Sequence, residues 1–326
     1  MREWFDRAIQ RCLPTGQAGG DFARYTFPYS LIPLFFAGFP SAARLLLSVF
    51  LLFGMASCYE DRKGCLDPRA TNFDIDADRE CDGCCVYPQL RLVFEHKLSP
   101  DSTANLTYNT EVYKDGVGNE FRVKDIQFYV SDARLVREDG TEIYPTDSLK
   151  VSVQPPGDIA QAAKISNNVA LINRNNFTPA AMGRFITTGN FTKIRFTVGL
   201  KGLLNQVVPT SLPDSLVNHP LENTAMYISA DSGFIFNRLQ LFTTAAPTDT
   251  IFTTFKIRNP EFADIELPLG TNVLEGFNIQ VVIRINYLKW LAGVDLKNDN
   301  PATVATKITH NLQNAFSVTR VEMKGT

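Results

Sequence analysis

The run Phe121–Val136, FRVKDIQFYVSDARLV, carries the clearest secondary-structure pattern in the chain. Apolar and polar residues alternate along much of it, and a period of two is typical of a strand with one buried face. The pattern predicts a long β-strand with a bend at Ser131-Asp132. Glu138-Asp139-Gly140 then predicts a hairpin turn that leads into a second strand at Thr141–Tyr144.

Further strands are expected on both sides of this run. Leu90, Leu92 and Phe94 alternate with other residues and predict a first strand that leads to His96. The region 155–190 is rich in Asn, Pro and Ala, and it is expected to be loop with one or two short helices. The remaining strands are predicted at Leu149–Val153, Phe191–Leu200, Gly233–Thr243, Ile251–Ile257, Phe277–Ile285 and Phe316–Met323.

One longer helix is expected near the C-terminus. Asn300-Pro301 opens it, because proline is favoured at the first helical position. Four apolar residues then recur at every fourth position, which predicts one stripe facing the sheets: Val304, Ile308, Leu312 and Phe316. Many short strands and few helices predict a mainly β fold, a β-sandwich of immunoglobulin-like or jelly-roll type with a few short helices, spanning residues 89–326 as one domain.

The composition is that of an ordinary globular protein. The chain has 326 residues, of which 44% are hydrophobic and 20% charged, and its formal net charge is −2. This balance gives no electrostatic case for a nucleic-acid partner. Phenylalanine is abundant, with 24 residues, and tryptophan is scarce, with two, which favours β structure.

The segment Leu45–Cys58, LLLSVFLLFGMASC, indicates export. Arg44, an apolar run and small residues before Cys58 are the parts of a secretory signal, and a cysteine at this position is typical of a bacterial lipoprotein. We therefore expect residues 1–57 to be a removed signal region, over-extended at its start, and Cys58 to carry the lipid on a tether, 58–63. A buried strand or helix ending in cysteine is the alternative reading, and a two-pass membrane hairpin is the alternative for the leading residues.

Residues 64–88 are expected to form a small disulfide-rich module. Cys65, Cys81, Cys84 and Cys85 give an even count in an exported segment, which predicts two disulfides with three pairings, the direct Cys84–Cys85 bridge being disfavoured by ring strain. A structural zinc site is the competing reading, although a second C-x-x-C pair is missing. The segment Gly64–Tyr87 resembles a short cysteine motif of exported proteins in Bacteroidetes-type bacteria, which implies an extracytoplasmic spacer.

No enzyme signature occurs in the sequence, which lacks G-x-S-x-G, H-E-x-x-H, P-loop and G-x-G-x-x-G motifs. The protein is therefore expected not to be an enzyme. His96, His219 and His310 lie in three distant segments and are the candidate metal ligands. Imidazole suits copper and zinc, so their convergence would make a metal site. The alternative is that each is an ordinary surface or hydrogen-bonded histidine.

Several motifs between residues 90 and 326 together resemble the methanobactin-associated periplasmic protein family and its copper-binding relatives, which are common as lipoproteins in Bacteroidetes. They are LVFEHKL (92–98), VYKDGVGNEFRVKDIQFYVSDARL (112–135), KIRFTVGL (193–200) followed by Asn205 and His219-Pro220-Leu221, AMYISADSGFIFNRL (225–239), and the closing helix Ala302–Phe316. The resemblance implies a β-sandwich in the periplasm, with copper as the cofactor of some members.

The sequence departs from that family at its copper chemistry. Copper binding in the family is associated with histidine ligands and an oxidatively modified tryptophan, but the two tryptophan positions are Ile228 and Ala230 here. Trp290 lies in another segment and is expected to pack a helix against the sandwich, whereas His96 matches the family pattern. The resemblance therefore implies the fold and the location more than it implies copper. We expect an outer-membrane lipoprotein, on the periplasmic or cell-surface side, that acts as a binding protein for a metal ion such as copper or for an unknown envelope protein.

Two alternatives to a binding protein remain. A structural or accessory envelope lipoprotein could keep the fold without the metal, and histidines that point to solvent far apart would favour it. A hydrolase is the third reading, and no nucleophile–base pair can be named for it.

Overall fold

The computed structural model describes residues 61–98, 104–174, 178–216, 218–244, 246, 248 and 250–325. The predicted signal region and Cys58 lie outside these residues. Contacts divide the chain into two units, and the described residues of the smaller one are 61–64 and 76–80. In that unit β1 (Lys63–Gly64) pairs with β2 (Arg79–Glu80) in parallel. The larger unit contains Cys65–Ile75 and everything described from Cys81 onward.

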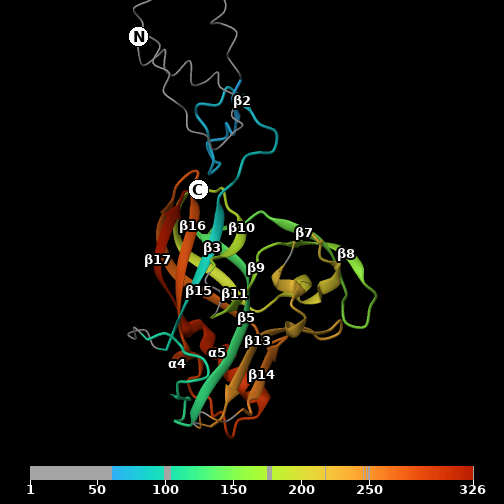
Figure 1. Ribbon diagram of the computed structural model, residues 1–326, viewed down its shortest axis with the longest axis vertical. Coiled ribbons are helices and arrows are strands. Elements are labelled where there is room, and N and C mark those ends of the chain that lie inside the picture. The colour runs from blue at the N-terminus through green and yellow to red at the C-terminus, as the bar shows by residue number, and fades with distance from the viewer. Residues whose placement is uncertain are drawn as a thin grey trace, which may run out of the picture. The chain divides into compact units, whose positions relative to one another are not determined.

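Two sheets, of four and nine strands, form the sandwich of the larger unit (Figure 1). The smaller sheet has the order β10-β3-β16-β17. Its central strands β3 and β16 are parallel to each other, while β10 and β17 pair antiparallel at the two edges. The bounds are β3 Gln89–Lys97, β10 Ala180–Arg184, β16 Asn278–Asn286 and β17 Phe316–Lys324.

The larger sheet has nine strands and is built on β5, which runs continuously over 17 residues. Its main path is β12-β13-β5-β11-β15, with β14 on β13 and with β4, β6 and β9 on β5. The bounds are β4 Tyr113–Lys114, β5 Glu120–Val136, β6 Glu142–Ile143, β9 Val169–Asn173, β11 Gly189–Val198, β12 Tyr227–Ser229, β13 Gly233–Phe242, β14 Thr253–Arg258 and β15 Ala263–Val273.

The main core contains the inward-facing residues of both sheets and the buried faces of α4 (Tyr287–Trp290) and α5 (Pro301–Ala315). Asn300 caps α5, because its side chain accepts a hydrogen bond from the Thr303 N–H. The predicted apolar stripe of this helix is buried, and Trp290 is fully buried against the sandwich, as expected. The predicted β-sandwich with few helices is therefore confirmed. No helix in the described part of the chain is long and apolar enough to cross a membrane.

A second, smaller core covers the other face of the larger sheet. The hairpin β7 (Ser148–Val153)–β8 (Gln161–Ser166) contributes residues to it beside Tyr129 and Phe234. So do three 3₁₀ turns, η3 Gly202–Gln206, η5 Pro220–Glu222 and η6 Thr224–Met226, whereas η4 Pro209–Ser211 contributes none.

The bend predicted in β5 is a bulge inside a continuous strand. Asp132 has φ of 56°, and the pairing with β11 shifts register at this point. The buried Asn168 side chain bridges the irregularity, since its Oδ1 accepts from the Ala133 N–H at 3.0 Å and its Nδ2 donates to the Ala133 carbonyl at 2.7 Å. An inserted residue therefore bends the strand without ending it.

Two regions were predicted wrongly. The region 155–190, expected as loop with short helices, contains the strands β8, β9 and β10, which pair with β7, β5 and β3. Its Ala and Asn residues have weak strand preference, so pairing with distant strands decides the structure there. The sequence pattern also missed β15, because it contains Pro268 and Gly270. Proline is tolerated here because β15 is an edge strand and Pro268 is exposed.

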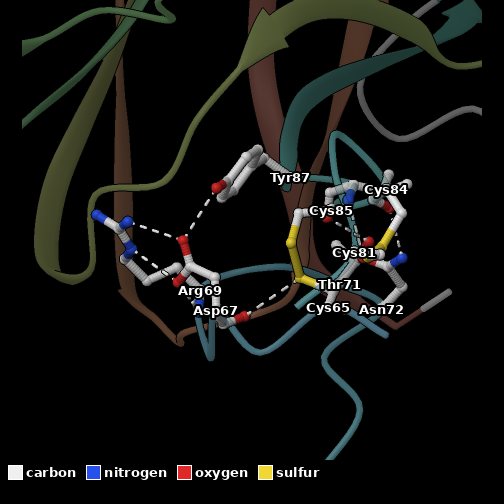
Figure 2. Close-up of a disulfide and its surroundings, with 10 residues drawn as sticks. Cys65, Asp67, Arg69, Thr71, Asn72, Cys81, Cys84, Cys85 and Tyr87 are labelled. Carbon is white, nitrogen blue, oxygen red and sulfur yellow. Dashed lines mark hydrogen bonds and ion pairs between the residues drawn. A yellow bond between two sulfur atoms is a disulfide. The ribbon is translucent and has the colours of Figure 1, made fainter. Parts of the chain in front are cut away.

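Both predicted disulfides are present, and the structure assigns their pairing (Figure 2). Cys65 is bonded to Cys85, with Cα atoms 5.0 Å apart, and Cys81 to Cys84, with Cα atoms 5.6 Å apart. These bonds leave none of the four thiols available to zinc. Asp67 accepts hydrogen bonds from Arg69 and from the Tyr87 hydroxyl, and the Arg69 bonds hold the pKa of the Asp67 carboxyl well below its usual range.

Candidate functional site: a cavity between two sheet edges

The candidate site is a cavity of about 850 Å³ lined by β3, β9, β10 and the turn that leads into η5. Its lining comes from both sheets. The strand β9, which pairs with β5, belongs to the larger sheet, and β3 and β10 belong to the smaller sheet. Among its lining residues, Thr178, Ala181 and Asn218 are exposed to solvent. The volume falls in the range of about 300–1,000 Å³ that small-ligand sites occupy.

Among the described residues, the lining of this cavity includes no Asp, Glu, Lys or Arg side chain. Most of the lining residues are apolar, among them Leu92, Ile172 and Ala180. Asn, Thr and His residues contribute a few neutral polar groups. Burying a charged group without a partner is costly, so a wall of this composition favours an uncharged ligand.

His96 lines the cavity and is only 8% exposed. Its Nδ1 is hydrogen-bonded to the Tyr287 hydroxyl at 2.8 Å, and the two rings stack with centroids 5.9 Å apart. Burial lowers the pKa of His96 to about 4, and the positive charge of Arg174 adds to the effect. The imidazole is therefore neutral at physiological pH. Its Nε2 has no hydrogen-bond partner within the described chain.

His219 lines the same cavity, but both of its ring nitrogens are engaged. Nδ1 accepts a hydrogen bond from the Leu221 N–H at 3.2 Å, so Nε2 carries the proton, which it donates to Asn167 Oδ1 at 2.9 Å. The side chain caps the short turn η5. Burial lowers the pKa of His219, although the charge of Glu222 opposes the shift. A nitrogen used in this way is not free to bind a metal.

The third candidate ligand, His310, is exposed on α5 and does not line the cavity. In the part of the chain that the structure describes, no three His, Cys, Asp or Glu side chains come together in a group that could hold a metal. Ile228, at the first family tryptophan position, is 39% exposed on β12, and neither Ile228 nor Ala230 lines the cavity.

The donor groups around His96 fall short of what copper requires. Copper sites combine several N, O or S ligands. Among the described residues, His96 Nε2 is the single free imidazole nitrogen on this wall. The described residues do not form a complete copper site. The pairing of His96 with Tyr287 does resemble the outer hydrogen bonds that orient metal-binding imidazoles.

The geometry defines a β-sandwich protein with a neutral, largely apolar cavity between two sheet edges. The family model MbnP matches residues 87–309, more than half of the chain, and the protein therefore belongs to the MbnP family. Among solved structures, the MbnP from Methylosinus trichosporium is similar over 63% of this chain and 76% of that chain, with 12% identity and a TM-score of 0.31. A search of curated proteins gave no match.

Sequence reasoning selected His96 but missed the groups that define its surroundings. Tyr287 is 191 residues away from His96, so no local pattern links the two. Asn167 and the β9 wall fall in the region that was expected to be loop. The polar pair Asn167-Asn168 was a usable signal, because buried amides commonly bridge irregular backbone.

Proposed function

We propose that this protein is a lipid-anchored binding protein of the cell envelope and that it holds an uncharged ligand in the cavity between β3, β9 and β10. The anchor would be Cys58, and the location the periplasmic or outer face of the outer membrane. The protein would act by binding and not by catalysis. It would contact the membrane through its lipid, and its partners would include an envelope protein but no nucleic acid.

One observation carries this proposal: a cavity of about 850 Å³ has an uncharged lining and a neutral, oriented imidazole in its wall. A structural or accessory lipoprotein has no need of such a cavity, because voids reduce the packing that stabilises a fold. Neutral groups at fixed positions in an apolar wall are the usual composition of a site that orients a ligand.

Copper is the second candidate ligand, and the His96–Tyr287 hydrogen bond favours it. Tyr287 holds one ring nitrogen, so Nε2 could occupy one coordination position, with water or a bound ligand supplying the others. The expected pH dependence of copper binding differs from that of an ordinary histidine ligand, whose pKa near 6.5 would weaken binding below about that pH. Because burial lowers the pKa of His96 to about 4, copper binding through Nε2 should persist at pH 5.5.

Native mass spectrometry of the protein isolated from its own envelope tests the proposal. We expect a bound, non-covalent mass on the wild type that Ala181→Trp removes, because Ala181 lines the cavity and a tryptophan there occupies its space. Ala162→Trp, at an exposed alanine of β8 that does not line the cavity, is the matched control and should keep the mass. A mass equal to copper, lost in His96→Ala and kept in His310→Ala, would identify the second candidate. Absence of any bound mass on the wild type, on Ala181→Trp and on Ala162→Trp would refute the binding function.

A further inference from the structure

Within the described residues, the main chain of β3 has no partner on one side at Phe94, which lines the cavity. Ile279–Asn286 of β16 runs along one side of β3 from Leu90 to Lys97. On the other side, the Phe185 N–H donates to the Pro88 carbonyl at 2.7 Å and the Leu106 N–H donates to the His96 carbonyl at 3.0 Å. Successive residues of a strand direct their main-chain groups to opposite sides, so Phe94 directs its N–H and C=O to this side as well.

No strand of the described chain pairs with Phe94 on that side. The pairing with β10 ends where Ala180 faces Leu92, directly after Pro179. The next contact along β3 is the isolated bridge between Lys97 and Asn105. Between these points, the Phe94 N–H and C=O form no hydrogen bond within the described residues, and Phe94 lines the cavity. Phe94 is half-buried. Most main-chain groups away from free solvent are paired, so an open donor–acceptor couple in a cavity wall indicates a place for a ligand.

We propose that the ligand is an uncharged peptide segment bound in extended form, its main-chain N–H and C=O paired with the C=O and N–H of Phe94. This inference rests on the proposed function, because it names the ligand class of the same cavity. Addition of a peptide to an open strand edge is a recurring mode of recognition, in which main-chain hydrogen bonds give affinity and side-chain pockets give specificity.

The walls fit such a segment. A peptide main chain presents N–H donors and C=O acceptors. These are the partners that the C=O and the N–H of Phe94 lack. Val169, Ala170 and Ile172 of β9 offer apolar surface to side chains, and the neutral lining excludes charged ones. Asn218 and Asn223 provide amide groups that can bind further main-chain atoms of the segment.

The test uses a pool of N-acetylated, C-amidated hexapeptides made of Ala, Val, Leu, Thr and Asn, selected on the full chain and then titrated singly. The selected peptide should lose about tenfold or more in affinity when the one amide that faces Phe94 is N-methylated, because its hydrogen bond to the Phe94 carbonyl is removed. N-methylation of the neighbouring amides, which point away, is the matched control. The peptide should also slow hydrogen exchange at the Phe94 amide and lose affinity for Ala181→Trp but not for Ala162→Trp.

Two results would overturn the inference. The first is a selected peptide that binds equally well with every amide N-methylated, since the strand pairing would then be absent. The second is a pool without any binder while the envelope protein still carries a bound mass that Ala181→Trp removes. In that second case the proposed function stands and the peptide class is wrong. Absence of both the peptide binder and the bound mass would reject the function itself.

Discussion

Replacing Trp290 with alanine should lower the free energy of unfolding by about 3–5 kcal/mol, the usual cost of truncating a large buried aromatic residue. Trp290 is 0% exposed. Its ring centroid lies 5.2 Å from those of Phe128 and Tyr287 and 5.6 Å from that of Phe316, so it joins α4 to β5 and β17. The substitution removes these contacts and leaves a cavity between the helices and the larger sheet. Urea unfolding followed by far-UV circular dichroism measures the change.

Leu288→Ala is the matched control for this substitution. Leu288 lies in the same short helix but is 43% exposed, so its truncation should change the free energy of unfolding by less than about 0.5 kcal/mol. Equal effects of the two substitutions would contradict the placement of Trp290 in the core. A large loss in Trp290→Ala alone supports its assignment to packing rather than to metal chemistry.

Lowering the pH from 7 to 4 should destabilise the protein through His96 by up to about 3 kcal/mol. The pKa of His96 is about 4 in the folded protein, against 6.5 for an ordinary histidine. Between these values the unfolded chain binds a proton that the folded protein does not, so stability is fully present above pH 6.5 and falls as the pH approaches 4. The cause is burial, since a charged imidazole loses its water in this site. His219 adds a contribution of the same sign.

His96→Gln isolates this effect, because glutamine does not titrate and keeps a polar group at the site. Chemical unfolding at pH 7, 6, 5 and 4 should give a shallower decline for the variant than for the wild type. Carboxylates with lowered pKa values, such as Glu142 with about 2, lose their stabilisation only at lower pH and in both proteins. Parallel pH profiles for the two proteins would show that His96 is not buried in solution.

The sequence predicted those parts of the fold whose signals are local. The helix α5 is predicted by neighbouring residues, namely Asn300-Pro301 and the apolar stripe from Val304 to Phe316. The strand β5 is predicted by the alternation in 121–136. The strands β8 to β10 carry weak local preference and form because β5, β7 and β3 offer pairing partners far away in sequence. The strand β15 also forms by pairing with a distant strand. It tolerates Pro268 because β15 is an edge strand and Pro268 needs no partner on its exposed side.

The candidate site was only partly predictable, for a related reason. His96 could be selected because it ends an alternating strand, and His219 because histidines are few. Their chemical states depend on Tyr287 and Asn167, which come from other segments and meet them only in the folded chain. The open main chain of Phe94 has no side-chain signature, because it results from where β10 stops pairing with β3.

Titration with the neutral fluorescent probe N-phenyl-1-naphthylamine tests most directly whether the cavity between β3, β9 and β10 takes up an uncharged ligand. The probe fluoresces more strongly when it leaves water for an apolar site. Wild type and Ala162→Trp should show the same saturable increase, and Ala181→Trp should bind at least about tenfold more weakly while keeping the wild-type unfolding curve. Equal binding by all three proteins, or binding by none, would contradict such uptake.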